Sequence, residues 1–167
     1  MKSQESNIVA LRETLGIFPT GVTIVTSADS EGNYVGMTVS SFNSVSLTPP
    51  LILWSIDKSS ASYSTFINSE YFAIHVLSDG QQALSQKFSI GGEDKFDDVR
   101  TALNANGVPI LPGCAACFQC RVESCYEGGD HTIVVGRVLE MEKTTKAPLV
   151  FYRGDYHRVS KSNKEVA

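Results

Sequence analysis

The stretch Gly36-Met37-Thr38-Val39-Ser40-Ser41-Phe42-Asn43-Ser44-Val45-Ser46-Leu47-Thr48-Pro49-Pro50 decides how the chain is organised. Two short β-type runs are joined by small hydroxyl residues and end at a Pro-Pro pair, which donates no ladder hydrogen bonds. Hydroxyl groups both donate and accept hydrogen bonds, so the segment can lay polar groups against a flat heterocyclic ligand. The alternative is an ordinary serine-rich strand and turn, since such residues are common between strands.

The rest of the chain alternates short apolar runs with turn residues. Strands are predicted at 22–27, 34–41, 43–47, 51–56, 71–77, 118–126, 131–141, 149–152 and 155–159. The run at 51–56 is nearly all apolar, which is typical of a strand buried on both faces. Turn residues at 29–33 and 127–130 predict hairpins. The pattern favours a mainly β protein, an antiparallel β-barrel with a few peripheral helices.

Three short helices are predicted outside the strands. The first covers 6–16, with Ser6 or Asn7 as N-cap, and its apolar stripe is expected to pack on the barrel or on a partner subunit. The second begins after a cap at Ser59 or Ser60 and buries one apolar face. The third follows Ser78 and Gln81, which have capping-box spacing, and runs through Phe88.

Length and composition indicate one domain over residues 1–167, with a core at about 8–158 and a polar, frayed tail at 160–167. The formal net charge is −4, which argues against a nucleic-acid binder. No run approaches the about 20 apolar residues of a membrane span, and no signal-peptide core is visible. We therefore expect a cytoplasmic protein whose four cysteines stay reduced.

Four motifs occur in a characteristic order: Phe18 to Thr26, Gly36 to Pro50, Lys58-Ser59-Ser60 and Gly129-Asp130-His131. Together they resemble the flavin reductase-like family, small NAD(P)H:flavin oxidoreductases that supply reduced flavin to two-component monooxygenases. The resemblance implies an FMN-binding split barrel, FMN or FAD, NADH or NADPH, a homodimer and a monooxygenase partner. No Gly-x-Gly-x-x-Gly follows a strand, so a Rossmann-type dinucleotide site is not expected.

The resemblance also assigns candidate flavin contacts. Residues that would touch the isoalloxazine ring and ribityl chain are Thr38, Val39, Ser40 and Ser41. A second cluster at a strand end and helix start either grips the flavin phosphate or caps the helix; it contains Ser55, Asp57, Lys58, Ser59 and Ser60. Phe88 either lies near the adenine or phosphate side of the flavin or is a core residue paired with Leu84.

The histidines have different expected roles. By resemblance, His131 contacts the nicotinamide or flavin ring and is the candidate catalytic residue. His75 lies inside a predicted strand and is expected to be a hydrogen-bonded core residue. Tyr152, Arg153 and His157 are expected to line a cofactor pocket.

Two other functions remain open at this point. An FMN-binding electron carrier resembling flavoredoxin would share the fold. A metal-binding or redox-sensing protein would use Cys114, Cys117, Cys120 and Cys125, whose spacing superficially resembles that of a cluster-binding motif. Cys120 and Cys125 fall in one predicted strand on opposite faces, and metal is not part of the resemblance, so no metal is expected. The sequence does not choose between FMN and FAD, or between NADH and NADPH.

Overall fold

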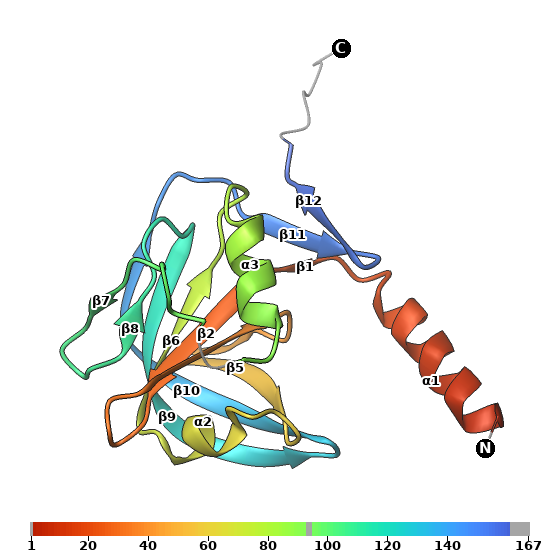
Figure 1. The fold of residues 1–167 in the computed structure, drawn as a ribbon, viewed down its shortest axis with the longest axis horizontal. Coiled ribbons are helices and arrows are strands. Elements are labelled where there is room, and N and C mark those ends of the chain that lie inside the picture. Colours follow the sequence, from red (N-terminus) through yellow and green to blue (C-terminus); the bar gives the residue numbers. More distant parts are fainter. Residues whose placement is uncertain (1, 93–94, 161–167) are drawn as a thin grey trace.

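The computed structural model describes residues 2–92 and 95–160 and is built around one curved antiparallel sheet (Figure 1). In spatial order the sheet contains β3 (Tyr34–Val39), β2 (Thr23–Ala28), β6 (Tyr71–Val76), β9 (Ala116–Gly128), β10 (His131–Lys143), β5 (Pro50–Asp57) and β4 (Asn43–Leu47). The two edge strands, β3 and β4, are consecutive in sequence. The sheet therefore curls until its edges meet at residues 40–42.

The hydroxyl group of Ser41 joins the two sides of this seam. Its Oγ accepts a hydrogen bond from the Ser55 N–H at 2.9 Å and donates to the Ser55 carbonyl at 3.2 Å. The end of β3 is thus fixed to β5 by a side chain in the way that a β-ladder would fix it.

A smaller sheet and the helices surround the main sheet. The small sheet contains β1 (Thr20–Gly21), β11 (Leu149–Tyr152) and β12 (Asp155–Arg158), and a separate two-stranded ladder joins β7 (Ala102–Leu103) to β8 (Pro109–Ile110). The helices are α1 (Lys2–Leu15), α2 (Tyr63–Asn68) and α3 (Gln82–Ser89). No helix in the described ranges is long and apolar enough to cross a membrane.

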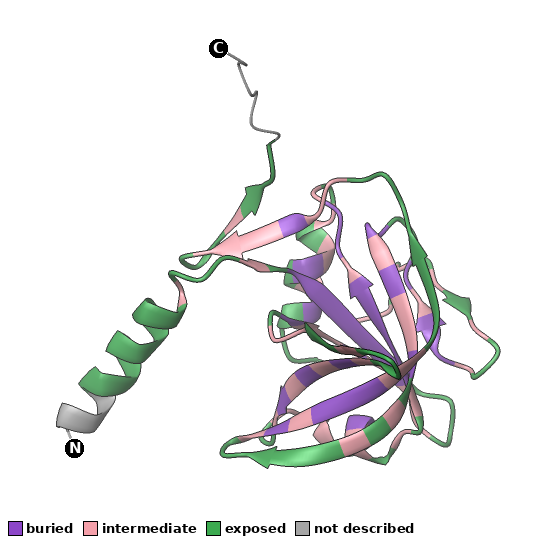
Figure 2. Cartoon of the chain, turned by 180° about the vertical axis from the view of Figure 1, so that it is seen from behind, coloured by how far each residue is buried: buried purple, intermediate pink, exposed green. Residues whose placement is uncertain are grey.

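Aromatic side chains fill the inside of the curved sheet. Trp54 is fully buried and packs edge-on against Phe66 of α2 at 5.1 Å between ring centroids. Phe72 lies on the other side of Trp54 at 6.0 Å. A second cluster lies between the sheet and α3 and contains Phe88 and Leu149, and Figure 2 shows buried residues along the strands and on α3. Burial of these side chains is the main favourable term for this fold.

Several element predictions need correction. Helix α1 begins at Lys2, because the polar residues before Ser6 are also compatible with a helix, and its exposed stripe does not pack on the described part of the barrel. Helix α2 begins at Tyr63 and Ser62 makes no side-chain capping bond, because Ser59 and Ser60 belong to the preceding turn. Of the predicted tail, residues 161–167 lie outside the described residues.

Strand β5 is fully buried on one face only, whereas burial on both faces was predicted. Its burial alternates, with Ile52, Trp54 and Ile56 buried and the intervening residues partly exposed, because only one face meets the core. Strands β1, β7 and β8 were missed, since two residues carry no periodic signal. The remaining predicted strands are confirmed to within a few residues at their ends, and the core role of His75 is also confirmed.

Candidate functional site

A cavity of about 250 Å³ lies beside the hydroxyl-rich end of β3. Its walls come from three places: the start of β2 and end of β3, the end of α3, and the β11–β12 hairpin. The lining residues are Val22, Thr38, Val39, Ser40, Ser89, Phe151 and Tyr156. Aliphatic, aromatic and hydroxyl groups meet here, which suits a flat heterocycle that has apolar and polar edges. We call this space the hydroxyl cavity.

One hydrogen bond and core packing inside the protein engage two of the predicted flavin contacts. The Thr38 hydroxyl donates to the Ser85 carbonyl of α3 at 2.7 Å, and the Ser85 hydroxyl bonds the Tyr156 hydroxyl at 2.8 Å. These bonds tie β3, α3 and β12 together around the cavity. The Val39 side chain is 9% exposed and packs in the core. Thr38 and Val39 therefore shape the wall, whereas Ser40 is exposed on it.

The second predicted cluster forms a tight turn after β5. One Asp57 carboxylate oxygen accepts hydrogen bonds from the Ser59 N–H and the Ser59 hydroxyl, each at 2.7 Å. The Ser60 N–H donates to the Asp57 carbonyl at 3.0 Å. The bonds from Ser59 hold the pKa of Asp57 below its usual range, so this carboxylate is ionised at neutral pH. The N–H groups of Ser59 and Ser60 are thus used within the turn.

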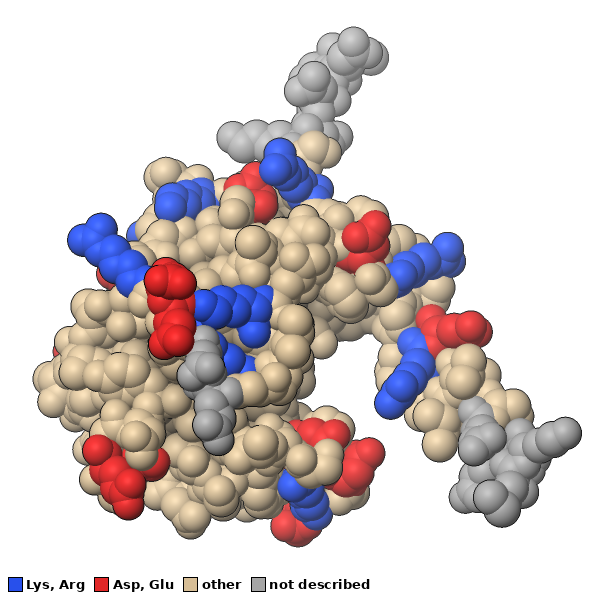
Figure 3. Space-filling model, viewed as in Figure 1, with Lys and Arg blue, Asp and Glu red and all other residues tan. Residues whose placement is uncertain are grey.

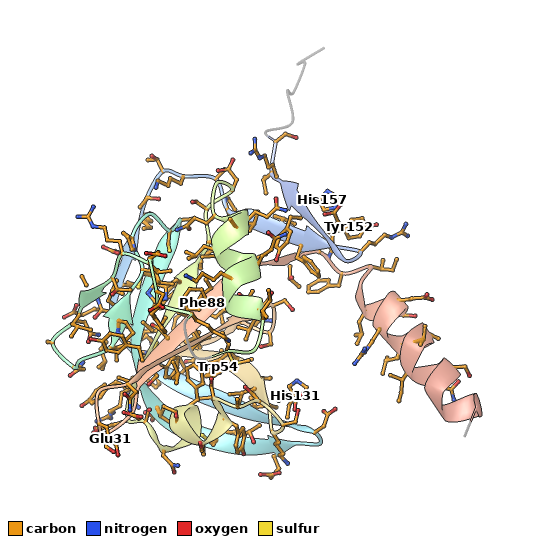
Figure 4. The ribbon with its side chains drawn as sticks, in the orientation of Figure 1. Glu31, Trp54, Phe88, His131, Tyr152 and His157 are labelled. Atoms are coloured by element: carbon orange, nitrogen blue, oxygen red, sulfur yellow. The ribbon has the colours of Figure 1, made fainter. Side chains whose placement is uncertain are left out.

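His131 lies on the strand next to this turn. It begins β10 and is paired in register with Asp57. Its Nδ1 lies 2.8 Å from the Asp130 carboxylate, and its side chain is 42% exposed. The fold therefore brings His131 and the 55–60 cluster together, although they are far apart in sequence. Figure 4 shows His131 at the end of the lower layer, on the side where the molecule opens.

Tyr152, Arg153 and His157 also come together, but on another face. The Tyr152 and His157 rings are 5.8 Å apart, and the Arg153 guanidinium lies 5.4 Å from the Tyr152 ring centre. Side chains alternate across strands, so Tyr152 and His157 lie opposite the Phe151 and Tyr156 face that lines the hydroxyl cavity. Arg153 instead borders a cavity of about 490 Å³ at the junction with α1.

The opening between these elements is visible on the surface. Figure 3 shows the molecule hollowed between the lower half of the barrel and the arm formed by α1 and the β11–β12 hairpin. In Figure 4, His131 lies on one side of this hollow and Tyr152 on the other.

Phe88 is a core residue in this structure. Its ring is fully buried and packs edge-on against Phe96 at 5.1 Å between centroids. It also lies directly over Gly36, where an added Cβ would be 2.5 Å from the ring. Of the two interpretations of Phe88, the structure favours packing over cofactor contact.

The cysteines do not form a metal-binding group. In the described residues, no three or more His, Cys, Asp or Glu side chains are placed to hold a metal ion. Burial raises the pKa of Cys114 to about 11 and the pKa values of Cys117 and Cys120 to about 12. These buried thiols are therefore protonated at neutral pH, whereas the nucleophilic form is the thiolate.

Sequence reasoning missed four residues that line the hydroxyl cavity: Val22, Ser89, Phe151 and Tyr156. Phe151 and Tyr156 are direct cross-strand partners and so share a face. The alternation of β11 and β12 separates this face from that of Tyr152 and His157, but it does not say which face meets the barrel. Val22 and Ser89 carried no signal of their own.

Comparisons with known proteins identify the family of the chain. Residues 15–160 match the family described as the flavin reductase like domain, and the chain belongs to this family. A relative from Agrobacterium fabrum strain C58, FMN reductase (NADH) SmoA, is 47% identical over 93% of this chain and 88% of its own length. The stachydrine N-demethylase reductase subunit Stc3 of Rhizobium meliloti strain 1021 is 42% identical over 98% of this chain and 71% of its own.

A solved structure supports the same assignment. The NADH:FAD oxidoreductase SgcE6 of Streptomyces globisporus C-1027, in complex with NAD and FAD fragments, superposes with a TM-score of 0.89. The two chains are 36% identical, and the match covers 95% of this chain and 96% of that one. The predicted family, the split-barrel fold and the flavin reductase class are thereby confirmed.

Proposed function

We propose that this protein uses NADH to reduce FMN or FAD bound at the hydroxyl cavity, and that it passes the reduced flavin to a partner monooxygenase. The observation that carries the proposal is the hydroxyl cavity itself, present in a chain of the flavin reductase family. We propose NADH and not NADPH as the hydride donor, because SmoA and SgcE6 are named as NADH-dependent enzymes. The cytoplasm is the proposed location, since all four cysteines are free thiols.

The residues of the cavity fit a flavin ring. Phe151 and Val22 provide apolar surface, and Ser40 and Ser89 provide polar groups at the rim. A flavin held here would supply the hydride-accepting chemistry, which belongs to the cofactors themselves. The role of the protein is to orient the two rings and to place hydrogen-bond donors where the reduced ring becomes anionic.

His131 is proposed to position the nicotinamide. The Asp130 carboxylate accepts a hydrogen bond from Nδ1–H, which fixes the ring orientation and directs Nε2 to a ligand. The Ser55 to Ser60 turn, across the strand pair from His131, is proposed to face the flavin phosphate, with Lys58 as its cation. The Tyr152 and Arg153 face is proposed to meet the outer part of a nucleotide.

A direct assay tests the enzyme assignment. Purified protein is mixed with FMN or FAD and with NADH or NADPH, and the loss of nicotinamide absorbance is followed. Turnover with NADH and at least one flavin is expected. Absence of turnover with every combination would contradict the proposal, and tight FMN binding without turnover would instead support an electron carrier.

Replacement of His131 tests its separate role. His131→Ala is expected to lower kcat/KM for NADH about 10- to 100-fold, because the nicotinamide loses an orienting contact. Flavin affinity, measured by fluorescence quenching, is expected to change little. An unchanged rate, or an equal loss of flavin binding, would show that His131 does not position the nicotinamide.

We also propose that the protein is a homodimer. The apolar stripe of α1 is uncovered within the described part of the chain: Ile8, Leu11 and Leu15 are 52%, 58% and 63% exposed. A helix of 14 residues without tertiary packing is marginally stable in water. A second copy of the chain is the proposed cover for this stripe.

A further inference from the structure

One lysine joins the turn after β5 to the turn between β9 and β10. The Lys58 backbone N–H donates to the Asp130 carbonyl at 3.0 Å. Its Nζ donates to the Gly129 carbonyl at 2.8 Å and forms an ion pair with the Glu127 carboxylate. Lys58 thus makes three contacts with the four residues that immediately precede His131.

One of these four residues, Asp130, orients the histidine ring. Asp130 lies 2.8 Å from His131 Nδ1, so movement of the turn moves the group that orients the ring. On the opposite strand, Asp57 is paired with His131, and Asp57 is the residue directly before Lys58. The backbone ladders fix His131 against Asp57 and Gly128, and the Lys58 contacts add to them at the end of β9 and in the turn before His131.

The main charged partner of Lys58 is Glu127. The hydrogen bond that Lys58 donates to the Glu127 carboxylate keeps the pKa of Lys58 above its usual range, and the Lys58 side chain is 35% exposed while that of Glu127 is 80% exposed. An ammonium group has three hydrogens. Two of them point to Glu127 and Gly129, which leaves the third for a further acceptor.

We propose that Lys58 is a positioning residue that couples the flavin phosphate to His131. Its ammonium group holds the end of β9 and the turn that follows it, through Glu127 and Gly129, and its remaining hydrogen meets the phosphate. This inference rests on the proposed function, because it assigns the phosphate to the 55–60 turn and the nicotinamide to His131. Glu127 then has two effects: it steadies the turn and it competes with the phosphate for the charge of Lys58.

Removal of the Glu127 charge is therefore predicted to change FMN affinity, riboflavin affinity and KM for NADH in different ways. In Glu127→Gln the lysine charge is less neutralised, so FMN is expected to bind about two- to fivefold more tightly, the size of a surface ion-pair effect. Riboflavin, which has the same ring without the phosphate, is expected to bind as before. The turn becomes looser, so KM for NADH is expected to rise about two- to fivefold with either flavin.

Two further variants sharpen the experiment. Lys58→Met is expected to raise KM for NADH with both flavins and to weaken binding of FMN but not of riboflavin. Glu123→Gln is the matched control, because Glu123 lies on the same strand and its carboxylate pairs with Arg137 at 2.6 Å, away from the turn. This control is expected to change neither flavin affinity nor KM for NADH.

The outcomes separate this inference from the proposed function. If Glu127→Gln and Lys58→Met leave KM for NADH unchanged, or if FMN and riboflavin respond alike, Lys58 does not couple the two sites. The same conclusion follows if Glu123→Gln reproduces the effects. A wild-type protein that oxidises no NADH with any flavin would refute the proposed function, and the coupling with it.

Discussion

Two hydrogen bonds hold His75 in its neutral form, because its ring donates one of them and accepts the other. Its Nδ1–H donates to the Ile24 carbonyl at 3.1 Å, and its Nε2 accepts from the Leu111 N–H at 3.1 Å. Only the neutral ring with a proton on Nδ1 satisfies both partners. The ring is fully buried, and this desolvation lowers the pKa of His75 to about 4. One residue thereby links β2 and β6 to the loop that contains Leu111.

The depressed pKa makes stability depend on pH. The unfolded chain has an ordinary His75 pKa of about 6.5, so between about 4 and 6.5 it binds more protons than the folded chain. The contribution of His75 is therefore complete above about pH 6.5 and decreases as pH falls towards 4, by about 3 kcal/mol in total. Urea unfolding between pH 5 and pH 8 is expected to show this decrease.

His75→Gln provides the comparison. This variant is expected to be less stable than the wild type at pH 7.5, because one of the two hydrogen bonds loses its geometry. It is also expected to lack most of the decrease between pH 6.5 and pH 5, since position 75 then carries no titratable group. Identical pH dependence in the two proteins would show that the decrease has another source.

At the scale of elements, α3 and β3 approach closely because Gly36 has no side chain. A Cβ at this position would lie 2.5 and 2.7 Å from two atoms of the Phe88 ring and 3.2 Å from Phe96. Phe88 is fully buried and has little room to move. Gly36→Ala is therefore expected to lower the free energy of unfolding by about 1–3 kcal/mol, the typical cost of overpacking. Urea denaturation measures the change.

Gly21→Ala is the matched control for this prediction. Gly21 is also a strand glycine, but no atom of the described residues lies within 4 Å of the position that an added Cβ would take, and its φ is not in the left-handed region. A change within about 0.5 kcal/mol is expected. If the two variants were equally stable, close packing between α3 and β3 would not be the reason for a glycine at position 36.

The strands themselves were largely predictable from sequence. β-branched runs between turn residues located β2, β4, β9 and β10 within a few residues, because local alternation and turn chemistry act over short distances. Which face of a strand meets the barrel was harder to predict. The alternation of β11 separates Phe151 from Tyr152, yet only packing against β1 and α3 decides that Phe151 lines the hydroxyl cavity.

At the scale of the whole molecule, α1 and the strand β4 both expose large apolar side chains. Helix α1 extends away from the barrel with its apolar stripe exposed (Figures 1 and 2). On β4, Leu47 is 91% exposed. If a second copy covers the α1 stripe, Leu11→Glu is expected to shift the protein from dimer to monomer, because a buried unpaired charge is costly. Light scattering after size-exclusion chromatography measures the mass.

A charge placed elsewhere on α1 controls for effects on the helix. Ala10→Glu introduces the same side chain about a third of a turn away from the apolar stripe, where residues are exposed. This variant is expected to keep the mass of the wild type. A monomeric wild type, or a dimer that survives Leu11→Glu, would show that the stripe is not the interface.

The sequence by itself determined the order of strands and turns and the family, because these depend on local patterns and on motifs within short segments. The tertiary structure decided which side chains meet. Lys58 and Glu127 are 69 residues apart and Ser41 and Ser55 are 14 apart, yet each pair is in contact. Such contacts depend on strand register and on the curl of the sheet, which no local pattern contains. For this reason Ser41, predicted as a flavin contact, joins the barrel seam, and Lys58, predicted as a phosphate ligand, also holds the turn before His131.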